Sequence, residues 1–250
     1  MKENEFIGKK VLVTGSSRGI GHEIGKLFVK NGASVIFTGK SKPENLKKLK
    51  NSFYFSCDLT KEKDIDDLFN YTKDVFDNEL NILICNLGNG KVPVKSKYKK
   101  KEWEETFNLN FFSSVYTIQK FLDNFTKSKN RSITCISSIC GNSAIGCPLP
   151  YSVAKSALNS YVKNLSKIIA SQKIRINCIS PGNILFPGST WDQKLKSNSS
   201  ETNNYILSNV PLQKFGSIKN ISELVLFLSS SSSSFTTGSN FVVDGGQIDV

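Results

Sequence analysis

A tyrosine and a lysine four residues apart are the side chains of this sequence with the clearest chemical use. Tyr151 and Lys155 stand in a segment of good helix formers, so we expect both on one helical face, about 6 Å apart along the axis. A phenol can donate a proton, and a neighbouring ammonium lowers its pKa toward neutrality by favouring the phenolate. The pair is a candidate general acid or base, although the same spacing is also common on solvated helices.

Ser138 adds a hydroxyl group to this pair. It follows the apolar, strand-like run Ile133–Ser137 and stands thirteen residues before Tyr151. A serine hydroxyl beside the tyrosine can donate to a substrate carbonyl oxygen and so polarise the carbon. Ser137 is the adjacent alternative, but side chains alternate along a strand, so we expect it to point elsewhere.

A glycine-rich turn stands near the start of the chain. Thr14 and Gly15 follow the apolar run Lys10–Val13, and Gly19 and Gly21 open a helical segment. Glycines permit a tight turn and a close approach of backbone to ligand, while a helix amino end attracts a pyrophosphate. Such glycines also serve packing alone, but the position after the first expected strand favours a dinucleotide site.

Short β-branched runs alternate with amphipathic segments, which is typical of a parallel sheet covered by helices on both faces. We therefore predict one α/β domain over residues 1–250 with a doubly wound sheet of about seven strands. Between the strands we expect helices at about Gly19–Lys30 and Lys61–Asp74 and a charged helix between Thr38 and Phe53. The expected strands are Lys10–Val13, Ser34–Thr38, Phe53–Cys57, Ile82–Cys85, Ile133–Ser137, Ile174–Ile179 and Asn240–Val243.

The order of these motifs over about residues 8 to 247 resembles the short-chain dehydrogenase/reductase family, including its 3-oxoacyl-[acyl-carrier-protein] reductases. The landmarks include Thr-Gly-x-x-x-Gly-x-Gly, Asn86-Leu87-Gly88, Tyr151-x-x-x-Lys155 and Val243-Asp-Gly-Gly246. The resemblance implies a Rossmann fold and hydride transfer between a nicotinamide and a carbonyl or alcohol. The catalytic residues it implies are Asn110, Ser138, Tyr151 and Lys155. The expected cofactor-binding residues are Gly15, Ser17, Arg18, Gly19, Ile20, Gly21, Lys40, Asp58, Leu59, Asn86, Gly88, Tyr151, Lys155, Pro181, Gly182 and Ile184.

The resemblance also implies individual roles. Asp58 would contact the adenine, and Asn110 would hold a water in a proton relay that reaches Lys155. Lys155 would also bind the nicotinamide ribose, and Tyr151 would protonate the carbonyl oxygen. Asn108 lies two residues from Asn110 and is expected on another helical face.

Charge at the end of the second expected strand indicates the cofactor. An acidic residue there binds a free ribose 2′-hydroxyl, whereas a 2′-phosphate needs a cation. Gly39 occupies the acidic position, Lys40 follows it, and Arg18 stands in the glycine turn. We predict NADP(H) rather than NAD(H); the alternative is that Lys40 is one more surface lysine.

Three departures from the family pattern bear on the substrate. Leu87 is bulkier than the usual alanine, and Phe186 stands where a threonine is frequent, with Ser189 or Thr190 as substitutes. Residues 183–215 are the expected substrate lid, and their polar composition favours a polar or anionic substrate. The expected substrates are a 3-oxoacyl thioester or a sugar-type ketone of surface-glycan biosynthesis.

The net charge of +12 admits a nucleic acid, an anionic membrane or small acidic ligands as partners. Arginine occurs only at Arg18, Arg131 and Arg175, so the charge is mostly lysine, and biased codon usage is an equal explanation. Nucleic-acid recognition usually favours arginine. The cluster Lys91–Lys101 follows the fourth expected strand and is read as a solvated run, so we expect neither a nucleic-acid nor a membrane partner.

The remaining features concern location and assembly. The apolar runs are shorter than a membrane span, and Met1–Glu5 lacks a signal-peptide pattern, so we expect a cytoplasmic protein. The six cysteines form no CxxC pair, and His22 is the single histidine, which argues against a zinc cluster or a disulfide scaffold and predicts free thiols. We expect no metal, and a homodimer or homotetramer built on the helices of Asn110 and Tyr151.

Two further functions stay open. The chain is a non-catalytic NADP-binding or regulatory protein if the four candidate catalytic residues are unused. It is a nucleic-acid-binding protein if the lysine-rich loop has a phosphate backbone as its partner.

Overall fold

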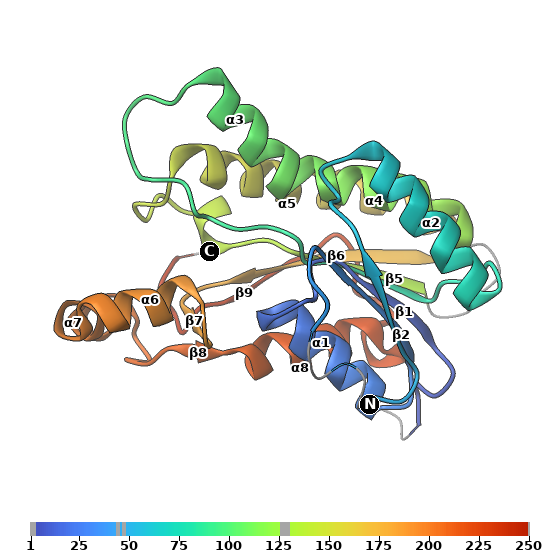
Figure 1. Ribbon diagram of the computed structural model, residues 1–250. Helices are drawn as coiled ribbons and strands as arrows, with labels where there is room; N and C mark the ends of the chain where they lie inside the picture. Colours follow the sequence, from blue (N-terminus) through green and yellow to red (C-terminus); the bar gives the residue numbers. More distant parts are fainter. Residues whose placement is uncertain (1–3, 44–45, 47–48, 126–130, 250) are drawn as a thin grey trace.

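A parallel sheet of seven strands forms the centre of the protein, in the order β3-β2-β1-β4-β5-β6-β9 (Figure 1). The computed structural model describes residues 4–43, 46, 49–125 and 131–249. Every strand pairing in this sheet is parallel, which confirms the predicted doubly wound α/β fold. The strands are β1 (Lys10–Val13), β2 (Ser34–Gly39), β3 (Ser52–Ser56), β4 (Ile82–Cys85), β5 (Arg131–Ile136), β6 (Ile174–Pro181) and β9 (Asn240–Val243).

Helices cover both faces of the sheet (Figure 1). On one face α1 (Gly19–Lys30) and α8 (Ile218–Ser229) pack against one apolar core. On the other face α2 (Glu62–Phe76), α4 (Ser113–Phe121) and α5 (Leu149–Ile169) pack against a second core. Two buried faces explain why the central strands read as continuous apolar runs.

The strand order places the ligand edge. From β1 the chain proceeds outward to β2 and β3 and then returns to β4 on the other side of β1. The order therefore reverses between β1 and β4, and ligands of doubly wound sheets bind outside the carboxyl ends of strands at such a point. The glycine turn after β1 and the loop after β4 meet there.

The segment before α4 is a helix of mixed geometry. Helix α3 (Lys100–Phe107) runs into a π-helical turn, Asn108–Phe112, and then into α4. A π-turn adds a residue to the helical repeat and is frequent at functional sites. Asn110 is at the centre of this turn and is buried.

The expected lid, residues 183–215, contains two helices. Helix α6 (Thr190–Ser197) and helix α7 (Ser199–Asn209) project beyond the sheet, at the left of Figure 1. Their base is a two-stranded parallel pair, β7 (Ile184–Leu185) and β8 (Gly216–Ser217). In the lid, Trp191 stacks on Tyr205 with ring centroids 5.3 Å apart.

Short 3-10 turns complete the description, at Leu122–Phe125, Ile139–Gly141, Ala170–Gln172 and Ser231–Ser233. The last turn lies in a run of six serines, Ser229–Ser234, whose first residue still belongs to α8. The charged helix predicted between Thr38 and Phe53 falls partly on residues 44–45 and 47–48, which lie outside the described residues. Among described helices, none is long and apolar enough to cross a membrane.

The cysteines correct one prediction. Cys57, Cys85, Cys135 and Cys178 are free and buried, as expected. Cys140 and Cys147, however, form a disulfide, whereas the sequence predicted free thiols throughout. The loop between them folds back so that their Cα atoms lie 6.0 Å apart, within the range that a disulfide spans. The absence of a CxxC pair says nothing about such a loop closure.

Candidate active site

The glycine turn is held by the strand beside it. Gly15 has a φ of 59°, and a Cβ atom there would lie 2.8 Å from the Cα of Leu87. The side-chain amide of Asn86 donates to the carbonyl oxygens of Thr14 and Gly15 at 3.2 and 2.8 Å. The turn therefore needs glycine at position 15, and Asn86 positions it from β4.

The amino end of α1 is suited to bind a phosphate. The helix begins at Gly19, and no described side chain caps it, so its first N–H groups remain available. Gly19 has a φ of 60°, and a Cβ atom there would lie 2.6 Å from the ring of Phe186. The lid residue that replaces the usual threonine therefore lies directly on the glycine turn.

The alternative substitutes for that threonine have other contacts. The hydroxyl of Ser189 accepts hydrogen bonds from the backbone N–H groups of Asp192 and Phe186 and caps α6. Thr190 is the first residue of α6. Ser189 therefore orders the start of the lid in this structure.

A serine hydroxyl lies where a side chain at the end of β2 would begin. A Cβ atom at Gly39 would lie 1.9 Å from the hydroxyl oxygen of Ser17. Lys40 follows and forms an ion pair with Asp58, with 2.8 Å between Nζ and Oδ2. Burial opposes ionisation of Asp58, but hydrogen bonds from Lys40 and Thr60 outweigh it and hold the pKa of Asp58 below its ordinary value. The predicted Lys40 and Asp58 thus meet at the adenine end.

The second predicted cation has a different neighbour. Arg18 is exposed, and its guanidinium lies 3.5 Å from where a Cβ of Gly188 in the lid would stand. The structure therefore places Lys40 against Asp58 and Arg18 against the lid. Both remain at the ligand edge: Arg18 belongs to the glycine turn, and Lys40 follows Gly39, which lies against Ser17 of that turn.

Tyr151, Ser138 and Lys155 come together at the carboxyl end of β5. Ser138 follows this strand, and Tyr151 and Lys155 lie on the first turns of α5. A hydrogen bond from Ser138 stabilises the ionised form of Tyr151, and the Lys155 Nζ atom lies 5.9 Å from the centre of the tyrosine ring. Ser137 instead donates to the carbonyl oxygen of Lys155, so the two serines point to different partners, as strand alternation predicted.

The electrostatics of this group differ from the expected ones. Lys155 is 3% exposed, and burial lowers its pKa to about 8. Its ammonium donates to the carbonyl oxygen of Ile136 at 2.9 Å. Burial raises the pKa of Tyr151, and the hydrogen bond from Ser138 opposes this only in part. The predicted lowering of the Tyr151 pKa is wrong for the protein by itself, because desolvation outweighs the hydrogen bond from Ser138.

Asn110 faces the same place from the π-turn. Its side-chain oxygen accepts the backbone N–H of Asn89 at 2.9 Å, and its amide donates to the carbonyl oxygen of Thr106. A Cβ atom at Gly88 would lie 2.7 Å from the Asn110 oxygen and 3.1 Å from the Lys155 nitrogen. Gly88 therefore lets Asn110 and Lys155 face one another, while Asn108 is exposed.

The remaining predicted cofactor residues border the same edge. Gly182 follows Pro181 at the end of β6, and a Cβ atom there would lie 2.7 Å from the Cβ of Asp244. This close packing joins the segment to the Val243–Gly246 motif. The others are placed as follows: Ile20 and Gly21 in the first turn of α1, Ile184 in β7, and Leu59 just before α2.

Two contributors were missed from the sequence. Asn89 binds Asn110 through its backbone, so its residue type carries no signal. Tyr54 donates its hydroxyl to the carbonyl oxygen of Gly39 at 2.6 Å and so braces the end of β2. The signal available for Tyr54 was its place in β3, the edge strand that lies beside β2.

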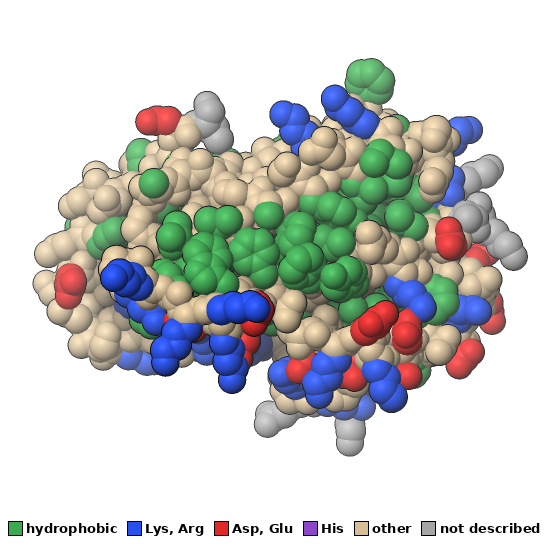
Figure 2. All heavy atoms as spheres, turned by 90° about the horizontal axis from the view of Figure 1, so that it is seen from above, with side chains coloured by type: hydrophobic (Ala, Val, Ile, Leu, Met, Phe, Trp, Pro, Cys, Tyr) green, Lys and Arg blue, Asp and Glu red, His purple; other side chains and the backbone are tan. Residues whose placement is uncertain are grey.

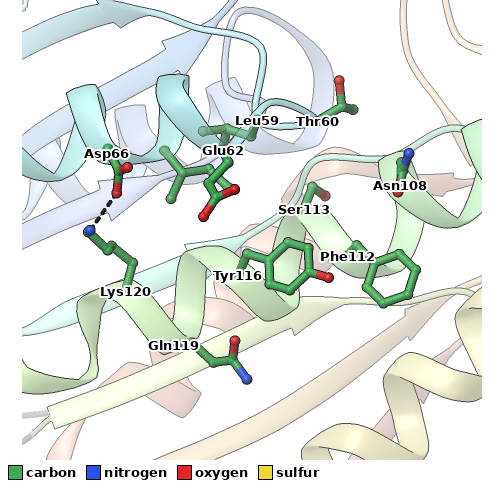
Figure 3. Close-up of a pocket in the computed structure, with 11 residues that line it drawn as sticks. Leu59, Thr60, Glu62, Asp66, Asn108, Phe112, Ser113, Tyr116, Gln119 and Lys120 are labelled. Carbon is green, nitrogen blue, oxygen red and sulfur yellow. Dashed lines mark ion pairs between the residues drawn. The ribbon is translucent and has the colours of Figure 1, made fainter.

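One hollow lies away from the reacting groups. A cavity of about 650 Å³ opens between the start of α2 and α4, with Tyr116, Phe112 and the ion pair of Asp66 with Lys120 along its wall (Figure 3). Of the predicted site residues, Leu59 lines it. A second hollow of about 260 Å³ is lined by Asn89, Lys91 and Asn110 and so reaches the candidate site.

The lysine cluster is partly neutralised. Exposed glutamates of α3 pair with three of its members, and such pairs contribute little to stability. The structure therefore supports a solvated run for much of the cluster. The pairs are Lys95 with Glu102 at 2.6 Å, Lys100 with Glu104 at 3.6 Å and Lys101 with Glu105 at 3.7 Å.

Comparison with known proteins decides the family. Residues 15–247 match a family model described as enoyl-(acyl carrier protein) reductase. The 3-oxoacyl-[acyl-carrier-protein] reductase of Chlamydia pneumoniae is 31% identical over 249 residues, covering 96% of this chain and 97% of the relative. The chain belongs to the short-chain dehydrogenase/reductase family. It is an oxidoreductase of that family, acting on carbonyl and alcohol groups.

Other relatives and solved structures agree with this membership. The corresponding reductase of Thermotoga maritima is 28% identical, covering 96% of this chain and 98% of its own. The L-sorbose reductase of Gluconobacter frateurii, solved with NADPH and L-sorbose, superposes with a TM-score of 0.90 at 25% identity over the whole of both chains. An NADPH-bound short-chain oxidoreductase of Pseudomonas aeruginosa shares the fold, with a TM-score of 0.88 at 23% identity and 97% coverage of each chain.

Proposed function

We propose that this short-chain dehydrogenase/reductase is an NADP(H)-dependent carbonyl reductase in which Tyr151 is the proton donor. The observation that carries the proposal is the convergence of Tyr151, Ser138 and Lys155 beside Asn110 and the glycine turn. A non-catalytic NADP-binding protein is the alternative, and it leaves this convergence without a use.

The adenine end fits a 2′-phosphate. Ser17 fills the space where an acidic side chain at position 39 would bind a free 2′-hydroxyl. Lys40 stands next to it with its side chain 76% exposed, so its ammonium can turn from Asp58 to a phosphate. The 3-oxoacyl reductase relatives and the NADPH-bound sorbose reductase are in accord with this choice.

Each candidate residue then has a role. A bound reduced nicotinamide supplies the hydride. Ser138 donates to the carbonyl oxygen, and Tyr151, which burial keeps protonated at neutral pH, transfers its proton to that oxygen. Lys155 binds the nicotinamide ribose and supports the phenolate that forms, while Asn110 holds the water that returns the proton.

The substrate class rests on the relatives and the lid. We propose a 3-oxoacyl thioester on a carrier protein, as the names of the bacterial relatives indicate for those enzymes. A sugar-type ketone is the second candidate, favoured by the sorbose reductase likeness. The lid contains Trp191, Lys194 and Lys196, and the ammonium of Lys194 lies 4.5 Å from the centre of the Trp191 ring.

The experiment is oxidation of NADPH and NADH in the presence of acetoacetyl thioesters, sugars and small ketones. We expect turnover with a lower Michaelis constant for NADPH; a preference for NADH would refute the cofactor. Tyr151→Phe should lower kcat by about a thousandfold, because general acid catalysis supplies a factor of that order. Its dissociation constant for NADPH should match the unchanged protein. A fully active Tyr151→Phe variant would refute the role of the tyrosine.

We further propose a homodimer or homotetramer built on α4 and α5. Figure 2 shows a band of hydrophobic side chains across the face that carries α3, α4 and α5. On α4 and α5, Tyr116, Leu149 and Val153 have 50%, 49% and 39% of their surfaces exposed, and Tyr116 stacks on Phe112. A large exposed apolar patch marks an interaction site. Sedimentation should give a dimer or tetramer that Tyr116→Lys shifts toward the monomer.

A further inference from the structure

The loop between Ser138 and Tyr151 contains a covalent bond that the proposed reaction does not use. Cys140 and Cys147 form a disulfide that closes this loop on itself. Both cysteines are half-buried, whereas the four other cysteines are buried. Of the six cysteines, the two in the disulfide are thus the ones that solvent reaches.

Cys140 is bonded to both ends of the candidate site. Its backbone N–H donates to the Ser138 hydroxyl oxygen at 3.2 Å. Its carbonyl oxygen accepts the hydroxyl of Ser152, the residue after Tyr151. Because the N–H of Cys140 occupies a lone pair of the Ser138 oxygen, the serine proton is left to donate to Tyr151 or a substrate. The position of Cys140 therefore sets the orientation of Ser138.

The two ends of the loop are held differently. Gly141 is anchored to α5, since its carbonyl oxygen accepts the Ser156 hydroxyl at 2.7 Å, and Asn142 bonds to Asn159. Residues 144–147, in contrast, make no hydrogen bond with any other described residue. The disulfide therefore ties this half of the loop to Cys140.

We propose that Cys140 and Cys147 are a thiol–disulfide exchange site for low-molecular-weight thiols, and that reduction frees residues 144–147 and, through Cys140, loosens the N–H bond that orients Ser138. In the exchange a thiolate attacks the Cys147 sulfur, forms a mixed disulfide there and releases Cys140 as a thiolate, which takes up a proton. A second small thiolate then attacks the small thiol's sulfur in the mixed disulfide, forms the small disulfide and releases Cys147 as a thiolate, which takes up a proton. In sum, two small thiols are oxidised to one small disulfide and the protein gains two thiols. The catalytic consequence rests on the proposed function, whereas the exchange itself does not.

The other cysteines are unsuited to this exchange. Cys85, Cys135 and Cys178 are paired across β4, β5 and β6 in one buried row. Burial raises the pKa of Cys178 above its ordinary value and that of Cys57 to about 11, so these thiols stay protonated. Hydrogen bonds from Cys178 and Cys85 lower the pKa of Cys135, but this thiol is fully buried between them and no small thiol reaches it. The exchange is therefore specific to the active-site loop.

The first test measures thiols and backbone exchange. Untreated protein and protein reduced with dithiothreitol are alkylated in the native state and mapped by mass spectrometry. We expect two alkylated residues, Cys140 and Cys147, in the reduced protein alone. Hydrogen exchange over residues 138–152 should be faster after reduction. Equal exchange in both states, or a failure to find the Cys140–Cys147 bond, would overturn the proposal whether or not the protein has carbonyl reductase activity.

The second test measures turnover. Reduction should lower kcat about fivefold, the factor that loss of one neutral hydrogen bond gives, with the Michaelis constant for NADPH unchanged. Glutathione disulfide should restore kcat. Cys147→Ser should have the low kcat in both states, while the matched variant Cys57→Ser should respond to reduction as the unchanged protein does. An equal kcat in both states with altered exchange would overturn the link to Ser138. Inactivity with every carbonyl would overturn the proposed function and leave the exchange site decided by the first test.

Discussion

Lys155 is the residue whose environment departs most from that of its type. Its ammonium is buried and bonded to a backbone carbonyl oxygen, and its pKa is lowered to about 8 from an ordinary 10.5. Between these values an unfolded chain binds more protons at this lysine than the folded protein does. Lys155 therefore makes the free energy of unfolding rise with pH across that window, because the cost of burying the charge disappears.

The same titration limits cofactor binding. In the role proposed for it, Lys155 binds the ribose hydroxyls through its ammonium and needs its charge to support the Tyr151 phenolate. We therefore expect kcat/KM for NADPH to be constant below pH 8 and to fall about tenfold per pH unit above it, as one proton is lost. The Tyr151 pKa is raised, so the tyrosine adds no break near neutrality.

A variant separates this lysine from other groups. Lys155→Arg keeps its charge at every accessible pH. It should be slower at pH 7, because the guanidinium has a different shape, but its profile should lack the break near pH 8. A break at the same pH in Lys155→Arg would show that another group titrates, and circular dichroism would verify that the variant is folded.

The side-chain roles at this site could be predicted from residue types, whereas the roles of backbone groups could not. Tyr151, Lys155, Ser138 and Gly15 were predictable, because a proton donor, a cation, a hydroxyl and a left-handed turn each require a particular side chain. Asn89 and Cys140 act through backbone N–H groups, which every residue except proline has. The direction of the Tyr151 pKa also needed the fold, since burial decides it.

At the scale of elements, the lid lies against the glycine turn at two places, Phe186 on Gly19 and Gly188 beside Arg18. Phe186 lies on Gly19, where the pyrophosphate would meet the first N–H groups of α1. We therefore predict that the ring moves when a cofactor binds. Phe186→Ala should raise the association rate constant for NADPH severalfold in stopped-flow fluorescence. The matched variant Phe215→Ala, also in the lid region, should leave that rate unchanged; a slower association in Phe186→Ala would show that the ring assists binding.

The elements differ in how far the sequence revealed them. The strands were predictable because burial on both faces demands apolar runs, and each expected strand is present with small shifts at its ends. The π-turn at Asn110 was not, since one extra residue in a helical turn leaves no mark in periodicity. The Cys140–Cys147 bond was missed for a related reason: pairing depends on where the loop returns in space.

At the scale of the whole molecule, lysines account for most of the net charge of +12, and some of them form ion pairs whereas others are free to act on a partner. The pairs with α3 glutamates remove three lysines of the Lys91–Lys101 cluster from long-range action. Lys91 lines the hollow that reaches Asn110, and the neighbouring Gly90 lies against the Tyr151 ring. Lys91 thus stands beside the site, where it would attract an acidic carrier protein.

This placement predicts different salt responses for two substrates. Attraction between exposed charges is screened by salt, so kcat/KM for a 3-oxoacyl thioester on an acidic carrier should fall about threefold between 50 and 200 mM salt. A small acetoacetyl thioester should show no such fall. Lys91→Glu with Lys97→Glu should lower kcat/KM for the carrier substrate alone, whereas Lys30→Glu, at the far end of α1, should lower it less. Equal salt responses for both substrates would argue against a carrier protein and favour the sugar-type ketone, because a neutral sugar has no charge for the cluster to attract.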